Sequence, residues 1–321
     1  RSATATSGPG FSLMVEGLGW AGINEVPIVV THYQRSGPST GQATRGSQED
    51  LLSTLFASHG EFTRFVLASG DHEEAFYDSI EAFNLAERYQ VPVIHLLDKF
   101  LANSIATMPI PDFARIRIER GEVVEHPGKG YKRFDLSKIM SPRAFLGSDA
   151  VIGHSGAEHD ESGHTTEDRI NRLKMYEKRM KKLELADTEI PEERRAEYYG
   201  PEDADFLLVG WGYSKMIALD ALEKLSEMGY KGSYLHVKMF APFPARYVRS
   251  VLNRVASERV IAIEHNYQAQ ASMAIKMYTS IDVDRRIVKY TGRPMYLEEV
   301  VGAVKKILDE GVKRVVMSHG A

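Results

Sequence analysis

The sequence contains no cysteine among its 321 residues. This absence excludes disulfides, thiolate zinc sites, cysteine nucleophiles and cysteine-ligated iron–sulfur clusters from the chain itself. Any cluster chemistry would have to come from a partner. Long apolar runs are missing too, since no segment approaches the roughly 20 residues that span a bilayer. No signal peptide is visible, so we expect a cytoplasmic protein with no membrane partner.

An excess of basic residues is also missing. The chain has 40 lysines and arginines against 44 acidic residues, which gives a formal net charge of -4. A general nucleic-acid binder needs a basic face, so no nucleic-acid partner is expected. Hydrophobic residues make up 43% of the chain, which is enough for a substantial core. The length corresponds to about two domains.

Short apolar segments alternate with amphipathic helical patterns in both halves of the chain. This alternation predicts an α/β fold with parallel sheets. We expect strands at 28–30, 65–68, 91–97, 206–209, 234–237, 259–264 and 286–290, with helices at 11–21, 47–59, 71–89, 165–185, 215–228, 244–256, 268–279 and 297–308. The predicted organisation is a first domain at 1–113, a connecting segment at 114–204 and a second domain at 205–321. Within the connecting segment, residues 114–134 are typical of short, glycine-broken strands. Ser7 is a plausible cap of the first helix, and Thr165 or Thr166 of the long one.

Polar and glycine residues gather in two loops of the first 50 residues. One loop holds Ser7, Gly8, Pro9 and Gly10, and the other follows the strand at 28–30 and contains Arg35, Thr40 and Thr44. In open parallel sheets, ligands bind beyond the carboxyl ends of the strands. The planar guanidinium of Arg35, surrounded by hydroxyls and glycines, is suited to hold a carboxylate by two parallel hydrogen bonds. Alternatively, Arg35 caps a helix or forms a surface ion pair.

Two further stretches carry candidate ligands. The run from Glu158 to His164 contains three carboxylates and two imidazoles, but His159 and His164 are five residues apart and do not share a helix face as a zinc-protease pair does. A solvated or subunit-contact loop is the alternative to a metal site. The turn from Gly210 to Ser214 resembles the start of a dinucleotide fingerprint, with Lys215 in place of the third glycine. It is equally a tight strand-to-helix turn.

Polar residues follow two other predicted strands. The segment from Glu264 to Asn266 could be catalytic, and the alternative is a buried glutamate satisfied by neighbouring backbone amides. Asp98 and Lys99 are placed in the same way, and for them the alternative is an ion pair. No Gly-X-Ser-X-Gly element and no Walker A loop is present, so hydrolase and P-loop functions are poorly supported.

Several adjoining motifs run along the chain: TATSGPGFSLMVEGLGWAG, NEVPIVV, QRSGPSTGQATRGSQEDL, GEFTRFVLASGDHEEAF, SPRAFLGSDAVIGHSGAEHDESGH, MYEKRMKKLE, DADFLLVGWGYSK, HVKMFAPFP, VIAIEHNYQAQ and KYTGRP. Together they resemble the α subunit of 2-oxoacid:ferredoxin oxidoreductases. They occur in the order of the family and cover nearly the whole chain. The resemblance implies a thiamine-diphosphate enzyme that converts a 2-oxoacid and coenzyme A to acyl-CoA and carbon dioxide, with two electrons passing to ferredoxin.

The resemblance also implies a division of roles. Residues up to about 113 would belong to the domain that holds the pyrimidine side of the cofactor, and residues from about 205 would resemble the transketolase C-terminal domain. A β subunit would supply the diphosphate and Mg²⁺ site and the iron–sulfur cluster. Arg35 would pair with the substrate carboxylate, Thr44 would line the same pocket beside the thiazolium, and Ser7, Gly8, Pro9 and Gly10 would lie near the cofactor. From its place in the loop of Arg35, Thr40 is also expected to bind substrate.

Two elements of the family pattern are not in the sequence. These are a Tyr-Pro-Ile-Thr-Pro-type element that contacts substrate and the glutamate that polarises the aminopyrimidine ring. We therefore expect a preceding segment of the same gene product that supplies both. Two other hypotheses remain open, which are a non-catalytic scaffold subunit and a nucleotide-binding oxidoreductase domain built on the turn at Gly210.

Overall fold

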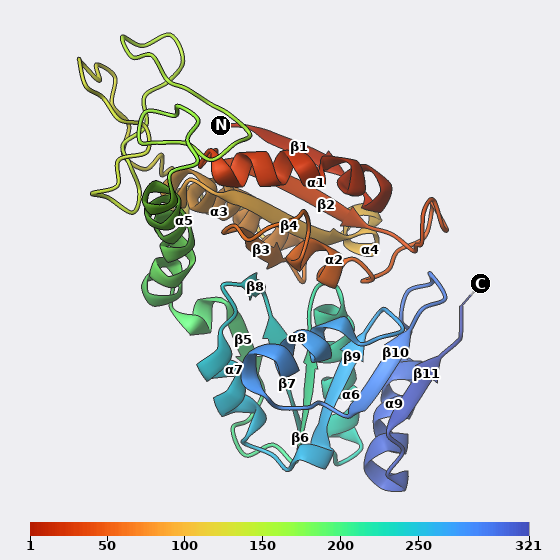
Figure 1. The fold of residues 1–321 in the computed structure, drawn as a ribbon. Coiled ribbons are helices and arrows are strands. Elements are labelled where there is room, and N and C mark those ends of the chain that lie inside the picture. The colour runs from red at the N-terminus through yellow and green to blue at the C-terminus, as the bar shows by residue number, and fades with distance from the viewer. Residues whose placement is uncertain (321) are drawn as a thin grey trace.

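The computed structural model describes residues 1–320 and contains two stacked α/β units (Figure 1). The first unit, red to orange in Figure 1 apart from the cyan strand β8, has a sheet of strand order β1-β2-β4-β3-β8, and the second, green to blue, has the order β11-β10-β9-β6-β7-β5. The predicted α/β class is confirmed. No helix in the described range 1–320 is long and apolar enough to cross a membrane.

The first sheet is built from parallel strands and one antiparallel edge. Its strands are β1 (Ala3–Thr6), β2 (Ile28–Gln34), β3 (Phe65–Ala68), β4 (Pro92–Asp98) and β8 (Met239–Ala241). Strand β8 pairs antiparallel with β3, so the second half of the chain contributes an edge to the first sheet. Val29, Val93 and Ile94 are almost completely buried, as expected for central parallel strands covered on both faces.

Four helices accompany this sheet: α1 (Gly8–Ile23), α2 (Leu51–Leu55), α3 (His72–Tyr89) and α4 (Lys99–Asn103). Ser7 occupies the N-cap position of α1, but its side chain makes no capping hydrogen bond, so that part of the prediction is wrong. The predicted helix at 47–59 is reduced to α2. Residues before it bond to the second unit instead, as the Gln48 backbone N–H donates to the His265 carbonyl at 2.9 Å.

The connecting segment, yellow to green in Figure 1, has little regular structure before its long helix. The strands expected at 114–134 do not form in the described chain, which has only a 3-10 turn η1 (Phe113–Arg115) and an isolated Val123–Arg143 bridge there. Ion pairs, rather than strand pairing, attach this segment to the first unit. Glu87 of α3 binds Arg120 at 2.8 Å and Arg143 at 2.6 Å.

The long helix α5 (Arg169–Glu189) runs along the side of the first unit (Figure 1). Asp168 caps it by accepting from the Asn171 N–H at 2.7 Å, which corrects the prediction of a threonine cap. Lys178 and Lys182 of α5 both reach the buried Glu25 carboxylate at 2.6 Å. Burial opposes ionisation of Glu25, yet the two ammonium groups hold its pKa well below the usual range. This buried contact fixes α5 to the first unit.

The second sheet has five parallel strands and one antiparallel edge, β5. Its strands are β5 (Ala196–Tyr199), β6 (Phe206–Gly210), β7 (Gly232–Val237), β9 (Val260–Glu264), β10 (Arg285–Lys289) and β11 (Arg314–Met317). Its helices are α6 (Ser214–Glu227), α7 (Ala245–Leu252), α8 (Gln270–Thr279) and α9 (Leu297–Glu310), with 3-10 turns η2 (Glu192–Arg194) and η3 (Ser257–Arg259). The strands predicted after residue 205 all form.

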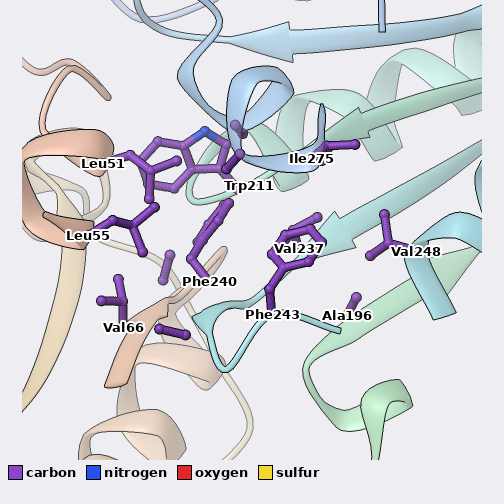
Figure 2. Packing of buried hydrophobic residues seen from close by; sticks show 14 of the residues in the cluster. Leu51, Leu55, Val66, Ala196, Trp211, Val237, Phe240, Phe243, Val248 and Ile275 are labelled. Carbon is purple, nitrogen blue, oxygen red and sulfur yellow. The ribbon is translucent and has the colours of Figure 1, made fainter. Parts of the chain in front are cut away.

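The two units share one hydrophobic core. Figure 2 shows Leu51 and Leu55 of α2 facing Trp211 and Phe240 of the second half of the chain. The Trp211 and Phe240 rings meet edge to face, with centroids 5.4 Å apart. Because this cluster is continuous, the relative position of the two sheets is set by apolar packing as well as by hydrogen bonds.

Candidate functional site

Arg35 lies where the sequence predicts it, directly beyond the carboxyl end of β2. It lines a cavity of about 690 Å³ together with Ser7, Tyr33 and Lys99. Its guanidinium makes no hydrogen bond or ion pair with any residue in the described range, and its Nε is buried without a partner. Arg35 therefore neither caps a helix nor forms a surface ion pair in this structure. A buried donor without an acceptor is costly, which favours an anionic ligand at this position.

The loop at the start of α1 contributes to the same cavity through Thr6 and Ser7. Gly8, Pro9 and Gly10 form the first turn of α1 and are not among the lining residues. Glycine is needed at position 10, because a Cβ there would overlap the Thr6 hydroxyl. Of the predicted cofactor-binding loop, only Ser7 thus faces the cavity of Arg35.

Thr44 lies in a different but adjoining cavity of about 400 Å³ between the two units. This second cavity is mainly apolar, with Phe100, Tyr213 and Pro294 in its wall. Thr40 is exposed and lines neither cavity. The structure thus brings Ser7 to Arg35 and sets Thr44 in the neighbouring cavity. The two cavities share four wall residues from α4 and its end: Lys99, Leu101, Asn103 and Ser104.

Lys99, which the sequence marked only by its place with Asp98 after a buried strand, lines both cavities. The ion pair considered between Asp98 and Lys99 does not form. The Asp98 side chain turns inward and its Oδ2 accepts from the Tyr213 N–H at 2.8 Å, while Lys99 has no ionic partner in the described chain. Burial raises the pKa of Asp98 to about 7. The only sequence signal for Lys99 was its place directly after a buried strand.

Gln48 connects the loop of Arg35 and Thr44 to the second unit. Its side-chain Nε2 donates to the Trp211 carbonyl at 2.7 Å, and its Oε1 accepts from the His265 N–H at 2.9 Å. The Asn266 amide in turn donates to the Gln48 carbonyl at 3.0 Å. Gln48 is fully buried, so each of these bonds is protected from water.

Gln270 makes the reciprocal contact from the second unit. Its Nε2 donates to the Glu49 carbonyl at 2.7 Å, and its Oε1 accepts from the Leu52 N–H at 3.0 Å. Gly292 packs against the same loop at positive φ, where a Cβ would lie 2.8 Å from the Arg45 Cβ. The second unit thus holds the loop in place at both of its ends.

The turn from Gly210 to Ser214 is filled by the first unit. Gly212, at φ +56°, lies against the Asp98 carboxylate, and the Tyr213 N–H at the start of α6 already donates to that carboxylate. The amides of Trp211, Tyr213 and Lys215 are thus all bound to protein groups rather than open to a phosphate. The structure therefore favours the tight-turn interpretation of this stretch over the nucleotide-binding one.

The side chains of the other candidates from the sequence are bound by neighbouring protein groups. Glu264 accepts from the Ala271 N–H at 2.8 Å and from the Ser272 N–H at 3.0 Å, which is the buried, amide-satisfied alternative. Glu158 pairs with Arg179 at 2.7 Å, and both His159 ring nitrogens face backbone carbonyls. Within residues 1–320, no group of three or more histidine, aspartate or glutamate side chains is arranged to hold a metal.

Family models match both halves of the chain. Residues 1–179 match the model described as pyruvate flavodoxin/ferredoxin oxidoreductase, thiamine diphosphate-binding, and residues 204–300 match core domain II of pyruvate:ferredoxin oxidoreductase. The chain is 57% identical over 321 residues to 2-oxoacid:ferredoxin oxidoreductase 1, subunit alpha, of Aeropyrum pernix, covering 100% of this chain and 50% of that protein.

Two more distant relatives extend the comparison. The chain is 34% identical to the 2-oxoglutarate synthase subunit KorA of Methanothermobacter thermautotrophicus, over 83% of this chain and 69% of that protein. A solved 2-oxoglutarate:ferredoxin oxidoreductase from Magnetococcus marinus, with 2-oxoglutarate, coenzyme A and succinyl-CoA bound, superposes with a TM-score of 0.87 at 33% identity, covering 96% of this chain and 53% of that one. The chain spans about half the length of the first curated relatives that it matches.

Proposed function

The chain belongs to the thiamine-diphosphate-binding pyruvate flavodoxin/ferredoxin oxidoreductase family, and from this premise we propose that it is the 2-oxoacid-binding part of a 2-oxoacid:ferredoxin oxidoreductase α subunit. The proposed reaction converts a 2-oxoacid and coenzyme A to acyl-CoA and carbon dioxide, and two electrons pass to ferredoxin. The observation that carries this proposal is the Arg35 guanidinium, unpartnered in the described chain and facing a cavity beyond the sheet.

The first cavity fits the proposed cofactor. It is lined by the Thr6–Ser7 loop on one side and by Arg35 and Lys99 on the other, and its volume of about 690 Å³ lies within the usual range of ligand sites. Thiamine diphosphate would supply the nucleophilic carbon and the electron sink for decarboxylation. Ser7 would lie beside the cofactor, while Gly8, Pro9 and Gly10 would only hold the start of α1 close to it.

Other parts of the enzyme would come from outside this chain. We propose that a β subunit holds Mg²⁺ and the cofactor diphosphate and carries the iron–sulfur cluster. The absence of cysteine supports this division, since a cysteine-ligated cluster cannot be built here. An upstream segment of the same gene product would supply the threonine and glutamate elements of the family.

The proposed task of Arg35 is to orient the 2-oxoacid and to balance its charge. Two parallel hydrogen bonds from one guanidinium fix the plane of the carboxylate, which holds the keto carbon in a defined direction. The charge of this carboxylate disappears when carbon dioxide leaves. One cation on that group is therefore sufficient, and additional cations on it would oppose its loss.

The test is Arg35→Ala in the complete enzyme complex. We expect kcat/KM for a 2-oxoacid to fall by about 30-fold or more, because a charge-assisted hydrogen bond at the reacting group contributes about 2–4 kcal/mol. Steady-state assays with ferredoxin as acceptor measure this, with bound thiamine diphosphate quantified in parallel.

Arg249→Ala is the matched control, because Arg249 is exposed on α7 and has no side-chain partner in the described chain. A loss of less than a few-fold for Arg35→Ala would reject the role of Arg35. A wild-type complex that carries no thiamine diphosphate would instead favour the scaffold hypothesis.

A further inference from the structure

We propose that Lys99 is the receptor for a second anionic group of the substrate, so that the site selects 2-oxoacids with a carboxylate at each end. This inference rests on the function proposed above and names its substrate class. Lys99 would act as a specificity residue, while Arg35 would hold the carboxylate that is lost.

The sheet register places Arg35 and Lys99 side by side. Strands β2 and β4 are parallel neighbours, and Gln34 pairs with Asp98 as the last matched residues of the two strands. Arg35 directly follows β2, and Lys99 directly follows β4 as the first residue of α4. Because β2 and β4 are parallel neighbours, both residues lie at the carboxyl edge of the sheet. Both residues line the first cavity.

No acidic side chain compensates these two cations. The walls of both adjoining cavities contain Arg35, Arg45 and Lys99 but no aspartate or glutamate. The three other cavities described for this chain each have at least one carboxylate in the wall. The cations of the site are thus available for an anionic ligand.

The nearby carboxylates are engaged elsewhere. Asp98 accepts from the Tyr213 N–H at 2.8 Å, and Glu49 accepts from the Gly37 N–H at 2.8 Å. Neither forms an ion pair with Lys99, although Asp98 is its neighbour in sequence. The unpaired state of Lys99 therefore arises from the fold, which turns the adjacent acid inward.

Chemistry argues against both cations holding the same carboxylate. The carboxylate bound by Arg35 loses its charge during decarboxylation, and a second cation on it would stabilise the ground state more than the transition state. A second cation is useful only if it binds a group that stays charged throughout. The distal carboxylate of a 2-oxodicarboxylate is such a group.

The composition of the cavity wall is compatible with this assignment. Besides the two cations, the wall contains Leu97 and Leu101, which suit the methylene groups that separate the two carboxylates of a five-carbon 2-oxodicarboxylate.

The experiment compares Lys99→Met with the wild type in the complete enzyme complex. Methionine keeps much of the side-chain length and removes the charge. We expect the ratio of kcat/KM for 2-oxoglutarate to kcat/KM for 2-oxobutyrate to fall by about 10-fold or more, since hydrogen bonds to charged groups are the strong ones. Lys99→Arg keeps the charge and should restore most of the ratio.

Two controls separate this inference from its alternatives. Lys174→Met removes an exposed, unpaired lysine of α5 and should leave the ratio unchanged. The KM for coenzyme A is measured for every variant, because the phosphates of coenzyme A are the other anions that could reach Lys99.

The inference is overturned if Lys99→Met leaves the ratio unchanged, if it lowers both specificity constants equally, or if its main effect is a higher KM for coenzyme A. Calorimetric titration with glutarate and with butyrate, which cannot be decarboxylated, gives a readout without turnover. If the wild type turns over no 2-oxoacid, the proposed function fails. The preference for glutarate in the wild type, and its loss in Lys99→Met, would still decide the role of Lys99.

Discussion

At the scale of single residues, burial and register decide which side chains are available for chemistry. Arg35 was predicted from sequence because it directly follows a buried strand and stands among glycines and hydroxyls. Lys99 has the same relation to its own strand, but its acidic neighbour suggested an ion pair. Only the fold shows that Asp98 accepts from Tyr213, which is 115 residues away. Partners so distant in sequence leave no local pattern.

A substitution at Thr44 tests whether the second cavity also contacts the substrate. It lines the cavity next to that of Arg35, so we expect Thr44→Ala to raise the KM for the 2-oxoacid by a few-fold and to change kcat less. The reason is that a hydroxyl hydrogen bond contributes about 1 kcal/mol. Thr40→Ala, at an exposed position of the same loop, is the control. Equal kinetic constants for Thr44→Ala and the wild type would count against any contact with substrate.

Asp98 makes the stability of the chain depend on pH. Burial raises its pKa to about 7, whereas an unfolded aspartate titrates near about 4. Between these values the folded state keeps a proton that the unfolded state has released. The contribution of Asp98 to stability is therefore fully present below about pH 4 and is lost as the pH rises to 7, by up to about 1.4 kcal/mol per pH unit.

Asp98→Asn should remove this slope. The variant is expected to unfold at a higher temperature than the wild type at pH 7 to 8, and to gain nothing near pH 4. Thermal unfolding of the complex across this pH range measures the difference. A wild-type slope retained in the variant would assign the titration to another group.

At the scale of elements, the second unit positions the loop that carries Arg35 and Thr44. Gln48 and Gln270 cross the boundary in opposite directions and bond to backbone groups on the other side. The sequence predicted most strands of the fold, because buried parallel strands are short apolar runs. It overextended the helix at 47–59, since nothing local indicates that the backbone of Gln48 pairs with His265, 217 residues away.

Gln48→Met should loosen this loop without removing any residue from the cavity of Arg35. We expect the KM for the 2-oxoacid to rise by about 10-fold, because the variant leaves the buried His265 N–H without its acceptor, at a cost of about 1–3 kcal/mol, and removes one of the two donors to the Trp211 carbonyl. Steady-state kinetics and thermal unfolding of the complex measure the two effects. Gln268→Met, at an exposed position before α8, is the control. If stability falls while KM stays constant, Gln48 is only a packing residue.

At the scale of the whole molecule, the two α/β units act as one body. A continuous core and reciprocal glutamine contacts join them, and β8 of the second half completes the first sheet. The sequence could not predict this exchange of strands, because three residues followed by a proline are too short a signal. The second unit therefore contributes to the site by holding the loop that carries Arg35 and Thr44, and by supplying Tyr213 and Pro294 to the wall of the second cavity.

The measurement that tests the central claim most directly is a structure of the complete complex with a 2-oxoacid bound in the absence of coenzyme A. Our account predicts that both terminal nitrogens of Arg35 lie within hydrogen-bonding distance of the substrate carboxylate, with the keto carbon directed toward the thiamine ring. A substrate held elsewhere, with the Arg35 guanidinium turned to bulk water, would contradict it.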